Sequence, residues 1–181
     1  HCISQWGHDF RPSYRLIGDW LASLPKRPVV GAFTASATEE VERDMKRLLG
    51  LEDARVHITG FDRPNLAFTV IHESQRMDYV RDYVRNNPND VGIVYCATRA
   101  NVEKVHRELL RAGVKAGYYH GGLSDEERKY QQNRYAFDEV QVMVATNAFG
   151  MGIDKSNVRY VIHYQMPRNM ESYYQEAGRA G

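Results

Sequence analysis

Apolar runs and polar stretches alternate regularly from about residue 66 to the end of the chain. The runs at 91–96 and 142–145 show no alternation of apolar with polar positions, as expected for strands buried on both faces of a parallel sheet. The pattern predicts strands at 66–73, 91–98, 115–120, 141–146 and 158–165, and helices at 75–86, 99–111, 124–137 and from 169 onward. Repeated β-α units of this kind predict an α/β fold, a mostly parallel sheet with helices on both faces.

The first part of the chain holds fewer elements. It contains a predicted buried strand at 28–36, a helix that begins after Thr38 and ends at Gly50, and a short strand at 55–58. One strand-helix-strand unit is too little for an independent α/β domain, so we expect an incomplete piece of one. An interior strand without its neighbours is prone to pair with another chain, so a swapped or artefactual oligomer could form through this part.

A turn-rich segment, GFDRPNL, separates the two parts. Gly, Asp, Pro and Asn are the residues typical of turns and linkers. We therefore divide the chain into 1–59, a linker at 60–65, and a second domain at 66–181.

Composition narrows the classes of function. The 181 residues are 43% hydrophobic and 26% charged, which is typical of a soluble globular protein. No apolar run approaches the roughly 20 residues that span a bilayer, so we expect no membrane contact. The net charge is +1, so nucleic-acid binding would need a local basic surface. Cys2 and Cys96 belong to no metal-binding pattern, and we expect no metal ligand among the residues of this chain.

Candidate chemistry lies directly after the predicted strands, because ligands bind at the carboxyl ends of the strands in open α/β sheets. The residues at these positions are Thr98 and Arg99, then His120, Gly121 and Gly122, and then Thr146 and Asn147. In the following loop, Gly150 and Gly152 allow close backbone approach, while Asp154 supplies a carboxylate. The alternative is a plain turn, since a lone Gly-x-Gly is weak and no dinucleotide fingerprint is present.

Two further segments stand out, one at each end. Arg179 lies between small residues that leave its guanidinium room to reach outward to a phosphate; the alternative is a solvated surface arginine. Near the other end, Trp6, His8, Phe10 and Arg11 interleave aromatic and basic side chains, a composition that can stack on bases and neutralise phosphates. The alternative is a loop whose aromatic rings fold into a core.

Taken in order, these segments resemble the RecQ family of superfamily 2 DNA helicases over nearly the whole chain. His1 resembles the last residue of a DEAH motif. The other matching segments are CISQWGHDFRPSY with the aromatic-rich loop, AFTASAT with motif III, FDRPNL with the hinge between lobes, GIVYCATR with motif IV, YYHGGLSDEER with the segment after the next strand, VMVATNAFGMGIDK with motif V, and YYQEAGRAG with motif VI.

The resemblance implies a second RecA-like lobe preceded by an incomplete piece of the first, with ATP held between lobes and single-stranded DNA crossing both. It implies that Arg179 reaches ATP phosphates, with Gln175 and His1 as further catalytic residues. Asp154 would face the ribose, with Gly150 and Gly152 in the same nucleotide-binding loop. ATP and Mg²⁺ are the implied cofactors, and most of their ligands would lie outside these 181 residues.

The resemblance also implies the DNA contacts and the coupling residues. Thr98, Arg99, Thr146 and Asn147 would contact the DNA backbone. Trp6, His8, Phe10 and Arg11 would sense DNA. Thr34, Ser36 and Thr38 of motif III would link hydrolysis to movement of the lobes.

The implied function is ATP-driven unwinding of DNA, expected to run 3′ to 5′, in recombination or repair. The implied partners are single-stranded and partially duplex DNA and the rest of a helicase chain. The protein would be cytoplasmic and nucleoid-associated in a bacterium, or nuclear in a eukaryote. The sequence lacks the motif I lysine and the second arginine that the family has after GRAG, so we expect these 181 residues alone not to hydrolyse ATP. The alternatives are a non-catalytic nucleic-acid-binding fragment and a DEAD-box RNA helicase lobe.

Overall fold

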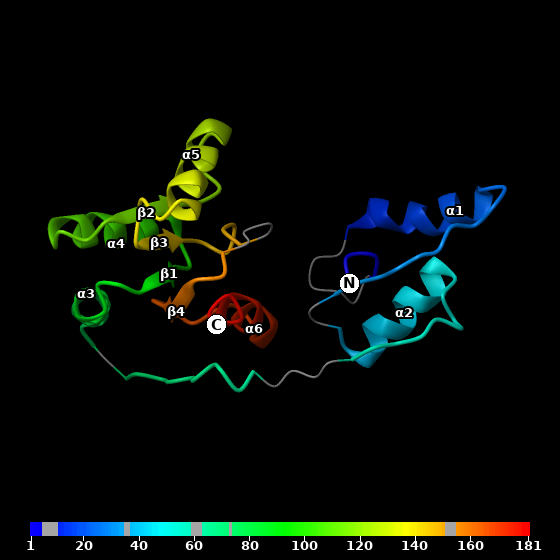
Figure 1. Cartoon of the computed structure of the whole chain (residues 1–181), viewed down its shortest axis with the longest axis horizontal. Coiled ribbons are helices and arrows are strands. Elements are labelled where there is room, and N and C mark those ends of the chain that lie inside the picture. The colour runs from blue at the N-terminus through cyan, green and yellow to red at the C-terminus, as the bar shows by residue number, and fades with distance from the viewer. Residues whose placement is uncertain (5–10, 35–36, 59–62, 73, 151–154) are drawn as a thin grey trace. The chain divides into compact units, whose positions relative to one another are not determined.

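The chain divides into two compact units, residues 1–62 and 63–181, in a computed structural model (Figure 1). The structure describes residues 1–4, 11–34, 37–58, 63–72, 74–150 and 155–181. The predicted sites at Trp6, His8, Phe10, Ser36, Gly152 and Asp154 lie outside these ranges.

The second unit is built on a four-stranded sheet. Its strands are β1 (Val91–Tyr95), β2 (Ala116–Tyr119), β3 (Val142–Ala145) and β4 (Val158–His163). They are all parallel and lie in the order β2-β3-β1-β4. This confirms the predicted α/β fold and the four strands expected between residues 91 and 165, with their ends one to three residues shorter than predicted.

Helices cover both faces of this sheet, as the sequence predicts. They are α3 (Arg76–Asn86) and α4 (Arg99–Arg111) on one face and α5 (Asp125–Ala136) on the other, and α6 (Met170–Ala177) follows β4. Val94 of β1 packs in one cluster with buried valines of α3 and α4, while its neighbours Ile93 and Tyr95 pack in a second cluster with Tyr135 of α5. Successive residues of a strand point to opposite faces, so β1 contributes to both cores.

Side-chain caps fix where the helices begin. The hydroxyl of Thr98 accepts from the N–H of Asn101, and the amide oxygen of Asn169 accepts from that of Ser172. At α5, Ser124 and Glu127 form the predicted capping box, in which each side chain accepts from the other residue's backbone N–H. Local polar residues therefore set the start of three of the helices that follow strands.

We expect Ser124→Ala to lower the melting temperature of the full-length protein by about 2–4 °C, because losing a cap costs about 1 kcal/mol. Ser156→Ala, in the exposed turn before β4, is the matched control and is expected to leave it unchanged. Equal melting temperatures for both variants in a calorimetric scan would contradict this role of the cap.

The first unit is helical where it is regular. It holds a 3₁₀ helix η1 (Pro12–Arg15), α1 (Leu16–Ser23) and α2 (Glu39–Leu49). Thr38 caps α2 as predicted, and Gly50 ends it in the left-handed conformation. A β-carbon at Gly18 would clash with the carbonyl oxygen of Leu48, so α1 and α2 pack closely because Gly18 has no side chain.

Three predicted strands are wrong. The described residues of 28–36, 55–58 and 66–73 form no strand. A strand needs a neighbour to pair its backbone groups. The described part of the first unit contains no strand at all, and 66–72 pairs with none of the four strands of the second unit. The apolar side chains of Val29 and Phe33 are consequently exposed, at 104% and 94%.

Among the described residues, no helix is long and apolar enough to cross a membrane.

Candidate functional site

The carboxyl ends of the four strands meet at one edge of the sheet. Tyr95 lies opposite both Ala145 and His163, and Ala145 lies opposite Tyr119. The residues that follow each strand are therefore gathered along this edge, as the sequence predicts for Thr98, Arg99, Thr146 and Asn147. Thr98, Arg99 and Asn147 are exposed there, whereas Thr146 is half-buried.

The turn between β1 and α4 is held by a residue that follows β4. The Oε1 atom of Gln165 accepts from the N–H of Ala97 at 3.0 Å and from Nδ2 of Asn101 at 2.9 Å. Thr98, in the same turn, uses its hydroxyl to cap α4. Sequence reasoning missed Gln165, because its partners lie more than 60 residues away along the chain.

Arg99 lies beside the glycine pair that follows β2. A β-carbon at Gly122 would be 3.0 Å from Nη1 of Arg99, so a glycine there leaves room for the guanidinium. Next to it, Nδ1 of the buried His120 accepts from the N–H of Gly122 at 3.2 Å, which leaves the proton on Nε2. That Nε2 lies 3.5 Å from Oε1 of Glu103 on α4. The polar side chains at the end of β2 and on α4 therefore lie together, and the guanidinium of Arg99 is the exposed cation among them.

Arg179 is half-buried against the loop that follows β3, rather than extending into solvent. A β-carbon at Gly150 would lie 2.8 Å from Nη2 of Arg179, and Gly150 has a φ of +151°, in the region that favours glycine. Tyr95 joins the two elements, because its hydroxyl donates to the carbonyl of Phe149 at 2.9 Å and accepts a hydrogen bond from Arg179.

The helix before Arg179 is anchored to the end of β4. Nε2 of His163 lies 2.8 Å from Oε2 of Glu176 on α6, and both side chains are nearly buried. The ring of His163 stacks on that of Tyr95, with centroids 5.8 Å apart, and lies 5.1 Å from the ring of Tyr173. Sequence reasoning missed Tyr95, His163 and Glu176, because only the fold brings them together.

The backbone beyond Arg179 is anchored as well. Nη2 of Arg63 lies 3.4 Å from the carbonyl oxygen of Ala180, and the N–H of Gly181 donates to the carbonyl of Val158 at 3.1 Å. The chain is therefore tied to neighbouring segments of the second unit on both sides of Arg179.

Burial sets the protonation of two groups at the end of β1. It raises the pKa of Tyr95, and it raises the pKa of the Cys96 thiol to about 12. Cys96 is therefore a neutral packing residue, and Tyr95 keeps its hydroxyl proton.

In the first unit, the structure brings together two of the predicted residues. Nδ1 of His1 lies 2.8 Å from Oγ1 of Thr34. Arg11 is exposed, and its guanidinium lies 5.8 Å from the centre of the Tyr14 ring.

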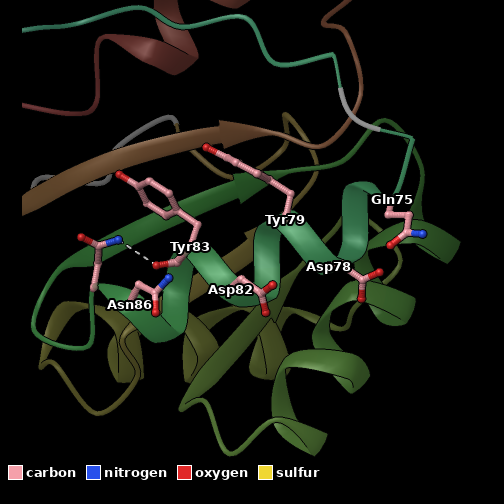
Figure 2. Close-up of a pocket in the computed structure, with 7 residues that line it drawn as sticks. Gln75, Asp78, Tyr79, Asp82, Tyr83 and Asn86 are labelled. Carbon is pink, nitrogen blue, oxygen red and sulfur yellow. Dashed lines mark hydrogen bonds between the residues drawn. The ribbon is translucent and has the colours of Figure 1, made fainter.

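A pocket of about 420 Å³ lies along α3, and none of the residues that line it is a predicted site residue (Figure 2). It is lined by Gln75, Asp78, Tyr79, Asp82, Tyr83, Asn86 and Asn87. Figure 2 shows the labelled side chains on α3 or directly before it, and Arg81 pairs with the carboxylates of both Asp78 and Asp82. The pocket is therefore a surface hollow beside internally paired charges and takes no part in the site at the sheet edge.

Comparison with known proteins places these features in a family. The family model described as the helicase conserved C-terminal domain matches residues 75–181. The ATP-dependent DNA helicase RecQ of Bacillus subtilis is 54% identical over the whole chain, which covers 31% of that relative, and RecQ of Pasteurella multocida is 46% identical, with 28% of it covered. The chain thus spans about a third of the length of these relatives.

The solved structures agree on the fold. Saccharomyces cerevisiae Dbp5, bound to RNA and ADP BeF3, matches 99% of this chain and 47% of its own with a TM-score of 0.80 at 19% identity. A DEAD box protein from Methanococcus jannaschii matches 60% of this chain and 30% of its own, with a TM-score of 0.55 at 29% identity.

Proposed function

Because this chain belongs to the RecQ family of superfamily 2 helicases, we propose that it forms part of a motor that couples ATP hydrolysis to DNA unwinding. The observation that carries the proposal is the group formed by Arg179, Gly150 and Tyr95, at the sheet edge where α/β folds bind ligands. Unwinding 3′ to 5′, in recombination or repair, is part of the same proposal.

Arg179 is proposed to contact the phosphates of ATP. A guanidinium suits this task because it stays charged and can donate two parallel hydrogen bonds to phosphate oxygens. It is held by Gly150 and Tyr95, so little conformational freedom is lost on binding. ATP supplies the phosphoanhydride bond that is broken, and the role of Arg179 is to stabilise the charge that develops on the phosphate oxygens. Gln175, half-buried on α6, would help position the same helix.

Mg²⁺ is assigned no ligand in this chain. The described residues contain no group of three or more His, Cys, Asp or Glu side chains that could hold a metal ion. We propose only that Mg²⁺ accompanies ATP, as it does in related phosphoryl-transfer motors.

The DNA backbone is proposed to cross the residues at the sheet edge, of which Arg99 and Asn147 are exposed and Thr146 is half-buried. Arg99 supplies a cation, and the hydroxyl of Thr146 and the amide of Asn147 supply uncharged donors, a set that suits sequence-independent phosphate contacts. In the first unit, Arg11 would add a further phosphate contact, and the pair of His1 and Thr34 would take part in coupling hydrolysis to movement.

The DNA contact of Arg99 has a measurable consequence. We expect Arg99→Ala in the full-length protein to weaken binding of single-stranded DNA by about threefold to tenfold. The slope of log K against log salt concentration should become shallower by about 0.7, because one fewer phosphate is neutralised.

Arg111→Ala is the matched control, because Arg111 lies exposed at the opposite end of α4 and pairs with Glu108. A fluorescence-anisotropy titration at two salt concentrations measures both quantities. Equal affinities and equal slopes for the two variants would remove Arg99 from the proposed DNA path.

A further inference from the structure

We propose that Tyr95 is a positioning residue that holds Arg179 for phosphate contact. The inference rests on the proposed function, in which Arg179 acts on ATP. Tyr95 belongs to the segment that resembles motif IV and lies on β1, an inner strand of the sheet. Gly150 and Arg179 belong to the segments that resemble motifs V and VI, so the proposal adds a third segment to this part of the site.

The hydroxyl of Tyr95 has two partners on two different elements. It donates its proton to the carbonyl of Phe149, 2.9 Å away, at the start of the loop after β3. Its lone pairs then accept from the guanidinium of Arg179. Because burial raises the pKa of Tyr95, the hydroxyl stays protonated and keeps this donor and acceptor arrangement at physiological pH.

The ring that carries this hydroxyl is itself buried and closely packed. Tyr95 ends β1, the strand paired on both sides, and only 3% of it is exposed. Its ring stacks on His163, whose Nε2 pairs with Glu176 of α6. The oxygen of Tyr95 is therefore fixed relative to both the loop of Gly150 and the helix that leads to Arg179.

A long arginine side chain needs such a support. Arg carries about 2 kcal/mol of rotamer entropy, and a misplacement of about 1 Å can cost about 100-fold in rate. Gly150 gives the guanidinium space on one side, and Tyr95 gives it a hydrogen-bond acceptor. The two together restrict the orientations that the guanidinium can take before a nucleotide binds.

The opposing explanation is that the hydroxyl of Tyr95 serves only as a hydrogen-bond donor to the carbonyl of Phe149 and does not position Arg179. A double-mutant cycle separates the two roles. We expect Tyr95→Phe in the full-length protein to lower kcat for DNA-stimulated ATP hydrolysis about 10-fold, with KM for ATP changed less than about twofold. In an Arg179→Ala background, Tyr95→Phe should lower kcat no further.

Tyr119→Phe is the matched control. Tyr119 ends the edge strand β2, its ring lies 5.0 Å from that of Phe149, and its hydroxyl accepts from Gln132. We expect wild-type kcat for this variant. Binding of ADP with aluminium fluoride, a transition-state analogue, should weaken about 10-fold in Tyr95→Phe while binding of ADP alone stays unchanged.

The outcomes are distinguishable. If Arg179→Ala itself leaves kcat unchanged, the proposed function of Arg179 fails, and this inference fails with it. If Arg179→Ala lowers kcat but Tyr95→Phe does not, the inference alone is overturned. It is also overturned if the two effects multiply in the double variant, or if binding of ADP weakens as much as binding of the analogue.

Discussion

Arg179→Ala in the full-length protein is expected to lower kcat for DNA-stimulated ATP hydrolysis by about 100- to 1,000-fold. Removing one donor to a developing oxyanion costs about this much in other enzymes. Arg179 is already fixed against Gly150 and Tyr95, so its contribution would come from a preorganised charge. Arg179→Lys should recover little, because an ammonium cannot reproduce the planar fork of the guanidinium.

Arg159→Ala is the control for this substitution. Arg159 is a cation of the same kind on β4, and its side chain is exposed. Its loss should change kcat by less than about twofold, and affinity for DNA should be equal in both variants. A kcat for Arg179→Ala within about threefold of the wild type would show that Arg179 is not in contact with the reacting phosphates.

Gly150→Ala is expected to lower kcat by about 10- to 100-fold. The new methyl group would lie 2.8 Å from Nη2 of Arg179, closer than a real β-carbon tolerates, so the guanidinium must move. It would also place a side chain at a φ of +151°. Because Arg179 acts through its position, its displacement should reduce kcat while the protein stays folded.

Gly113→Ala is the control that separates the effect of the steric clash with Arg179 from the effect of a side chain at a positive φ. Gly113 also has a positive φ, +78°, but a β-carbon there would meet nothing within 4 Å. This variant should lose about 1 kcal/mol of stability, seen as a lower melting temperature, with kcat unchanged. Equal kcat values for Gly150→Ala and Gly113→Ala would show that the contact between Gly150 and Arg179 has no part in turnover.

The pattern of apolar positions was enough to predict the second unit from 75 onward. Runs such as 91–95 and 142–145 are strands because the same chain supplies their neighbours. The run at 28–36 is also rich in apolar residues, yet its described residues form no strand, since composition indicates burial and only pairing makes a strand. Helix α1 was missed because Gly18 interrupts its pattern, and that glycine proves to be the close contact with α2.

The candidate site was predicted in part. Residues that follow strands could be found from sequence, because parallel strands end at one edge, and the register of β1 with β3 and β4 confirms that edge. The orientation of Arg179 could not be predicted. Its small neighbours allow the side chain to extend into solvent as readily as to pack against the loop after β3. Nothing in the sequence pattern pointed to Tyr95, His163 or Glu176. Their roles depend on side-chain contacts that join β1 to the loop after β3 and β4 to α6. The division into 1–59, 60–65 and 66–181 as pieces of two lobes stays a prediction.

The most direct measurement is the displacement of a labelled strand from a partial DNA duplex by the full-length protein. We expect displacement with ATP, none without it, and none with a matched RNA duplex. Arg179→Ala should slow it by about the same factor as it slows hydrolysis. Displacement of RNA but not DNA, or displacement of DNA that is independent of ATP, would contradict the assignment of this chain to an ATP-driven DNA helicase motor.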